Sequence, residues 1–117
     1  MKFNLSLKKT HIETINDLKT KHSVSSSQEL IKKYVESSLE LSDKDLIFGQ
    51  EREKCSGGCF ASEPQFSLEL DDDIFNKLKK IFDDYKFDSY KTSEEEVSKI
   101  IRCIINFIEE EPDLITI

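Results

Sequence analysis

The sequence predicts a small α+β protein, mostly helical, that contains two strand-helix-helix units in one chain. Residues 2–8 and 65–71 each alternate apolar and polar side chains, which is typical of a strand with one buried face. Two segments with apolar residues at helical spacing follow each strand. The two strand patterns coincide at an offset of 63 positions, so we interpret the chain as an internal duplication. Because a unit of about 40 residues buries little surface alone, we expect the two units to share one core.

The first unit spans residues 1–41. One helix is predicted from about Lys9 to His22 and a second from about Ser26 to Leu41, because apolar residues recur there at intervals of three and four. Both helix starts match a capping box, in which a Ser or Thr precedes a Glu by three positions; Thr10 begins the first and Ser26 the second.

Residues 42–64 form the predicted linker, because the apolar periodicity lapses and all three glycines lie there. Within it, residues 45–53 either extend the preceding helix or form a short one. Cys55 and Cys59 either close a short disulfide or remain two exposed thiols. Zinc is not expected, since a tetrahedral site needs four ligands and the chain offers no suitable set. Cys103 is expected in the core.

The second unit spans residues 65–117 and repeats the order of the first. A helix is predicted from about Asp72 to Lys86. The final helix is predicted from Ser93 to Glu111, with Ser93 as the first residue of a capping box and a stop at the following proline. This last helix is the more apolar of the two second helices, which suggests that it lies at the centre of the shared core.

Composition narrows the possible functions. The chain has 117 residues, 35% of them charged, and a formal net charge of −7. No apolar run approaches the roughly 20 residues that span a bilayer, and no secretory pattern follows Met1, so we expect the protein to work in the cytoplasm. The acidity is uneven: residues 1–41 carry a net charge of +2 and residues 65–117 a net charge of −7. A nucleic-acid partner is therefore compatible only with the first unit.

Catalysis is not expected. The two histidines, His11 and His22, have no Cys, Ser or carboxylate beside them in a nucleophile arrangement, and we assign them surface or capping roles. The acidic clusters lack the glycine-centred loop of an EF-hand, and no glycine-rich phosphate loop occurs. We accordingly expect no enzymatic activity, no cofactor and no metal.

The order of a short amphipathic strand, a helix and a Ser-capped helix resembles the ribbon-helix-helix family of transcription regulators, and two copies in one chain resemble a tandem version. The resemblance covers residues 2–41 and 65–111. It implies a pseudo-twofold fold in which the strands pair as an antiparallel ribbon that enters the DNA major groove. It also implies that the start of each second helix holds a backbone phosphate. Such regulators are known from bacteria and from viruses of hyperthermophilic archaea, and the Lys, Glu, Ile and Ser content is similar to that of the viral proteins.

The resemblance assigns the DNA contacts of the first unit to specific positions. The reading residues of the ribbon fall on alternate positions of the first strand, namely Lys2, Asn4, Ser6 and Lys8. Lys can donate to guanine, Asn can pair with adenine, and Ser suits either edge. The phosphate site falls on Ser25, Ser26 and Ser27, where hydroxyls and free backbone N–H groups meet the positive end of a helix dipole. An ordinary N-cap is the alternative role of these serines.

The second unit departs from this pattern. Its outward strand positions are Gln65, Ser67, Glu69 and Asp71, and residues 94–96 at its second helix start are all Glu. Although Glu69 can accept from cytosine N4, these carboxylates repel phosphate, and we expect the unit to serve pairing rather than DNA contact.

Two functions are compatible with this pattern. The first is a regulator that binds double-stranded DNA and self-associates along it, so that binding is cooperative. The alternative is a protein-interaction or antitoxin-like module whose acidic second unit binds a basic partner.

Overall fold

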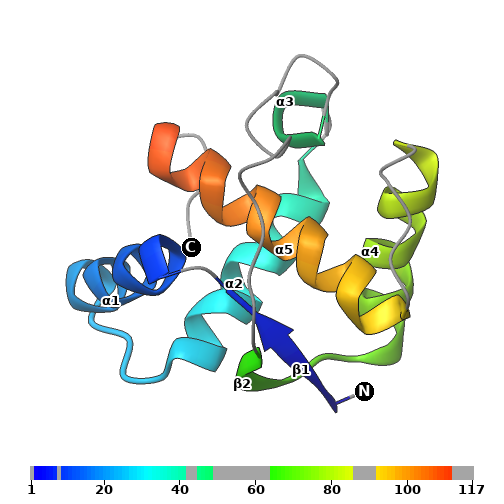
Figure 1. Ribbon diagram of the computed structural model, residues 1–117. Coiled ribbons are helices and arrows are strands. Elements are labelled where there is room, and N and C mark those ends of the chain that lie inside the picture. The colour runs from blue at the N-terminus through cyan, green and yellow to red at the C-terminus, as the bar shows by residue number, and fades with distance from the viewer. Residues whose placement is uncertain (1, 8, 42–44, 49–63, 86–91, 112–117) are drawn as a thin grey trace.

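The computed structural model describes residues 2–7, 9–41, 45–48, 64–85 and 92–111 (Figure 1). These residues form an α+β structure, mostly helical, with a two-stranded antiparallel sheet. The elements follow the chain in the order β1 (Lys2–Ser6), α1 (Lys9–His22), α2 (Ser27–Glu40), α3 (Asp45–Phe48), β2 (Pro64–Glu69), α4 (Asp72–Asp84) and α5 (Ser93–Glu110).

The start of α2 agrees with the predicted capping box. Ser26 has an extended backbone, and its side chain accepts a hydrogen bond from the backbone N–H of Glu29 at 3.3 Å. This bond satisfies one of the backbone donors that a helix start leaves without an intrahelical partner. The local signal was sufficient here because the accepting hydroxyl of Ser26 and the donating N–H of Glu29 lie within one turn.

Two other predicted capping boxes were wrong. Helix α1 already includes Lys9, so Thr10 lies inside the helix, where its carbonyl oxygen is 3.1 Å from Thr14 Oγ1. Helix α5 is capped by Thr92 rather than by Ser93, and Thr92 Oγ1 accepts from the N–H of Glu95 at 3.1 Å. The T-x-x-E pattern that begins at Thr92 overlaps the S-x-x-E pattern one residue later, and Thr92 is the residue that has the extended backbone of an N-cap.

The strands β1 and β2 pair in antiparallel register. Asn4 lies opposite Ser67, and Lys2 lies opposite Glu69. The pairing is irregular between Leu5 and Ser6, where the ladder skips one residue of β2. Such a bulge locally increases the twist of a ribbon.

The core is one continuous cluster to which both halves of the chain contribute. Leu5 and Leu68, on the inner side of the two strands, have no exposed surface. Strand β1 contacts α5, and strand β2 contacts α2, so each strand packs against the second helix of the other half. The two halves are therefore intertwined.

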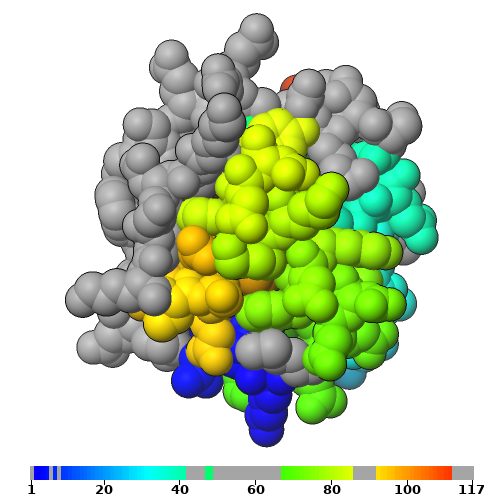
Figure 2. All heavy atoms as spheres, turned by 90° about the vertical axis from the view of Figure 1, so that its right-hand side faces the viewer, coloured from blue at the N-terminus to red at the C-terminus, as the bar shows by residue number. Residues whose placement is uncertain are grey.

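Helix α5 crosses the centre of the molecule, as the last predicted helix was expected to do (Figure 1). Its side chains are buried on nearly all sides from Val97 to Ile108, including Lys99 and Arg102, which are only 7% and 4% exposed. A helix buried all round belongs to a core rather than to a surface. Helix α4 lies along one side of α5, and Figure 2 shows it on the face beside the start of α5.

Candidate nucleic-acid interface

Among the strand residues whose exposure the structure describes, four lie exposed on the outer side of the β1–β2 ribbon: Lys2, Asn4, Ser67 and Glu69. We call these four residues the ribbon face. Residues opposite each other in an antiparallel pair project from the same side, and successive residues alternate between sides. The inward residues Phe3 and Leu68 are accordingly buried, with 3% and 0% exposure. The predicted alternation of buried and exposed strand positions is thus confirmed for these residues, and Lys2 and Asn4 lie on the solvent side as expected.

The structure does not test the roles of the other two predicted reading residues. Ser6 is the last residue of β1, and its backbone lies at the irregular end of the ribbon, opposite Pro64. Lys8 lies outside the described residues. The roles assigned to Ser6 and Lys8 stay predictions.

A tight turn leads from α1 to the start of α2. Ser23 has a positive φ of 57°. The N–H of Val24 donates to the carbonyl oxygen of Lys19 at 2.9 Å, and the N–H of Ser23 donates to the carbonyl oxygen of Thr20 at 3.3 Å. These two bonds define a Schellman motif, which normally carries glycine at the position of Ser23. The turn brings Ser25 to the rim of a shallow hollow that it shares with Lys19.

The three serines at the start of α2 have different roles in the structure. Ser25 is exposed, Ser26 is the N-cap, and Ser27 is the first helical residue. The Ser26 hydroxyl also donates to the side chain of Gln28 at 3.1 Å. The ordinary capping role is therefore present at Ser26, while Ser25 and Ser27 lie where a helix start offers N–H groups to an anion.

The starts of α2 and α5 lie on opposite sides of the ribbon (Figure 1). The contacts agree with this view, because α2 touches β2 and α5 touches β1. The ribbon face therefore lies between two helix N-termini, each of which carries the positive end of a helix dipole.

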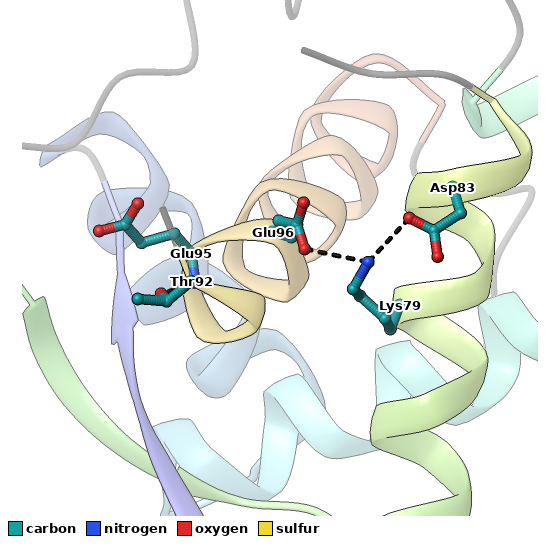
Figure 3. A network of polar contacts seen from close by, with 5 residues as sticks. All are labelled: Lys79, Asp83, Thr92, Glu95 and Glu96. Atoms are coloured by element: carbon teal, nitrogen blue, oxygen red, sulfur yellow. Dashed lines mark hydrogen bonds and ion pairs between the residues drawn. The ribbon is translucent and has the colours of Figure 1, made fainter. Parts of the chain in front are cut away.

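The start of α5 is occupied by the protein's own acidic side chains (Figure 3). Lys79 of α4 bridges two of its neighbours: its Nζ lies 2.7 Å from Asp83 Oδ1 and 3.0 Å from Glu96 Oε1. The hydrogen bonds that Lys79 donates, first to Asp83 and then to Glu96, raise the pKa of Lys79 above its usual value. Glu94 and Glu95 lie in the same first turn. This helix start is electrostatically unsuited to a phosphate, as the sequence predicted.

The two histidines have structural positions, and the surface or capping role predicted for His11 was wrong. His11 is 1% exposed, and its Nε2 lies 2.7 Å from Asn106 Oδ1 of α5. Its burial is possible because a hydrogen-bond partner from a distant segment meets the ring. His22 is the last residue of α1, and its Nε2 lies 3.2 Å from the hydroxyl of Tyr34, whose pKa is raised by burial.

The sequence did not reveal that Lys2 and Glu69 are neighbours. The signal was present, because an antiparallel pairing of two repeats centred on Asn4 and Ser67 brings these two residues opposite each other. The offset of 63 relates equivalent positions of the two units, and it does not by itself pair positions across the ribbon.

Comparisons with known proteins identify no relative: no family model matches the chain, and neither the curated proteins nor the solved structures gave a match. Within the described parts of the chain, no helix is both long and apolar enough to cross a membrane. Among the same residues, no three His, Cys, Asp or Glu side chains are grouped so that they could hold a metal ion. Cys103 is buried, as expected, whereas Cys55 and Cys59 lie outside the described residues.

Proposed function

We propose that this protein is a DNA-binding transcription regulator with a tandem ribbon-helix-helix fold, which inserts the ribbon face into the major groove. The observation that carries the proposal is the exposed polar side of a two-stranded ribbon between the starts of α2 and α5. A two-stranded ribbon has the dimensions to enter the major groove, and polar side chains that project from it can reach base edges.

The pairing register supports a pseudo-twofold relation between the halves. Asn4 and Ser67 are equivalent under the offset of 63, and they pair with each other. Phe3 pairs with Leu68, and Leu5 pairs with Phe66, which is the equivalent of Phe3. Exchange of the two halves therefore turns one of these pairs into the other. This relation is expected for two copies of one unit around a twofold axis. The reciprocal contacts of β1 with α5 and of β2 with α2 have the same symmetry.

The chemistry of the first half suits DNA. Asn4, at the centre of the ribbon face, can pair with adenine through both atoms of its amide, and Lys2 can donate to guanine. At the start of α2, Ser25 and Ser27 add hydroxyl and backbone donors for a phosphate. The first half thus supplies both base readout and a positioning contact.

The second half weakens the interaction, because Glu69 lies on the ribbon face and three Glu residues begin α5. One chain is therefore expected to bind weakly, and stable occupancy is expected to need several chains side by side on the duplex. Each chain would add a few phosphate contacts and contacts with its neighbour, which leads to cooperative binding.

The second candidate function is a protein-interaction or antitoxin-like module. It is favoured by the exposed acidic residues of the second half, which include Asp71, Asp72 and Asp73 beside the ribbon and Glu95 at the start of α5. These groups complement a basic partner protein. The two functions differ in their response to duplex DNA.

Gel retardation of duplex DNA over a range of salt concentrations tests the proposal. Binding through phosphate contacts weakens with salt: the logarithm of the binding constant falls against the logarithm of the salt concentration, with a slope of about −0.9 for each neutralised phosphate. Cooperative binding is expected to add a ladder of shifted bands. Asn4→Ala is expected to cost about 1–3 kcal/mol of binding free energy on a selected site. Asn76→Ala is the matched control, because Asn76 is an exposed residue of α4 and is not one of the four ribbon-face residues. Absence of binding at low salt, or equal losses for the two variants, would contradict the proposal.

A further inference from the structure

Lys2 and Glu69 are direct cross-strand partners at one end of the ribbon, and both are exposed. In an antiparallel pair, directly opposed residues project from the same side with their Cβ atoms about 4.5–5.5 Å apart. The ammonium group of Lys2 and the carboxylate group of Glu69 therefore project from neighbouring positions on the ribbon face. This face thus offers a hydrogen-bond donor and an acceptor of opposite charge next to each other.

A G·C base pair presents the complementary groups in the major groove. Guanine offers two adjacent acceptors, N7 and O6, and cytosine offers its N4 amino donor next to them. Lys donates to the guanine acceptors, and Glu accepts from the cytosine amino group. An A·T pair offers Lys only one acceptor, N7, before the N6 donor of adenine. A G·C pair gives Lys two acceptors and Glu a donor, so it engages the two side chains more fully than A·T does.

We propose that Lys2 and Glu69 together read one G·C base pair, to one side of the centre marked by Asn4 and Ser67. The other end of the ribbon cannot repeat this contact, because the bulge there places Ser6 opposite Pro64. The DNA site is therefore not palindromic, and the protein binds it in one orientation. This inference rests on the proposed function, and it gives Glu69 the contact with cytosine N4 that its chemistry allows, although the second unit was expected to serve pairing rather than DNA contact.

The inference separates specificity from affinity. Glu69 repels the phosphates of any duplex, so its removal can raise the affinity for all sequences while it abolishes the preference for one base pair. The measured quantity must therefore be the ratio of two affinities for one protein, on duplexes that differ at a single base pair. This ratio cancels the long-range repulsion, which is the same for both duplexes.

The experiment selects bound sites from random duplexes with three proteins: the wild type, Glu69→Ala and Asp73→Ala. Asp73 is exposed in the first turn of α4, so its removal takes the same charge from the same half without altering the ribbon face. The wild type and Asp73→Ala are expected to select one non-palindromic site with a G·C pair beside the centre. Glu69→Ala is expected to lose the preference at that base pair alone.

Affinity measurements on matched duplexes give the magnitude. Replacement of the G·C pair by A·T is expected to lower the affinity of the wild type roughly 5- to 150-fold and that of Glu69→Ala much less. An inosine·cytosine pair keeps the major-groove groups and lacks only the minor-groove amino group of guanine. The wild type is therefore expected to bind the inosine duplex as well as the original duplex.

The outcomes distinguish this inference from the proposed function. A palindromic wild-type site, a Glu69→Ala site identical to that of the wild type, or an equal loss in Asp73→Ala would overturn the reading by Lys2 and Glu69. The proposed function would stand in each of these cases. If the wild type bound no duplex at all, both would be overturned.

Discussion

His11 of α1 and Asn106 of α5, 95 positions apart in the sequence, are joined by a hydrogen bond of 2.7 Å between His11 Nε2 and Asn106 Oδ1. The His11 ring is 1% exposed. One helical turn further along both helices, the hydroxyl of Thr14 donates to Glu109. These two contacts attach the first helix of the first half to the central helix of the second half.

The bond between His11 and Asn106 is expected to contribute measurably to stability. Asn106→Ala removes the partner of a buried ring and should lower the free energy of unfolding by about 1–3 kcal/mol. Asn16→Ala makes the same chemical change at an exposed position of α1 and should stay within about 0.5 kcal/mol of the wild type. Chemical denaturation measures both values. Equal effects of the two substitutions would show that the contact adds nothing.

Ser23 is expected to be a site where glycine stabilises the protein. Among the described residues, it alone combines a side chain with a positive φ, and a residue with a Cβ atom is strained in that region. Ser23→Gly should raise the free energy of unfolding by about 0.5–1 kcal/mol. Ser25→Gly, in the same turn, should give no gain, because it adds only unfolded-state entropy. The two variants are compared by their denaturant midpoints.

Lys79 is expected to make stability depend on alkaline pH. Its pKa in the folded protein is raised above the usual 10.5 by Asp83 and Glu96. Folding therefore favours the protonated lysine, and the resulting stabilisation is fully present below pH 10.5 and is lost as the pH rises through the higher folded-state pKa. Lys79→Met should remove this part of the pH dependence.

Lys80→Met is the control for the pH experiment, since the side chain of Lys80 is 77% exposed and its pairing with Asp84 is longer, at 3.6 Å. Surface pairs of this kind contribute little. Melting temperatures of the wild type and both variants, recorded below and above pH 10.5, make the comparison. Parallel pH profiles for the wild type and Lys79→Met would contradict the prediction.

The two helix starts beside the ribbon are expected to respond differently to an added charge. Ser27 and Ser93 are the first helical residues of α2 and α5, and Asp is favourable for helix stability at either position. Ser27→Asp should nevertheless weaken DNA binding and reduce the salt slope by about one, because it repels a bound phosphate. Ser93→Asp should leave binding unchanged. Gel retardation at several salt concentrations tests the pair, and equal effects would argue against a phosphate at α2.

The sequence by itself determined those parts of the fold that depend on neighbours along the chain. The bounds of α1, the cap at Ser26, the inward positions of both strands and the central place of α5 all follow from periodicity and local hydrogen bonding. The solvent side of the ribbon, with Lys2 and Asn4, followed from the same alternation. The local signal is sufficient for the strands because their buried residues alternate with exposed ones, and for α2 because its buried residues recur at helical spacing.

Only the tertiary structure decided which distant residues meet. The choice of Thr92 over Ser93 as cap accompanies the ion pair of Glu96 with Lys79 on another helix. The burial of His11 depends on the side-chain amide of Asn106, 95 positions away. The pairing of Lys2 with Glu69 across the ribbon depends on the strand register. These contacts are settled by the packing of two intertwined halves around one core, where the free energy of each contact depends on side chains that no local pattern specifies.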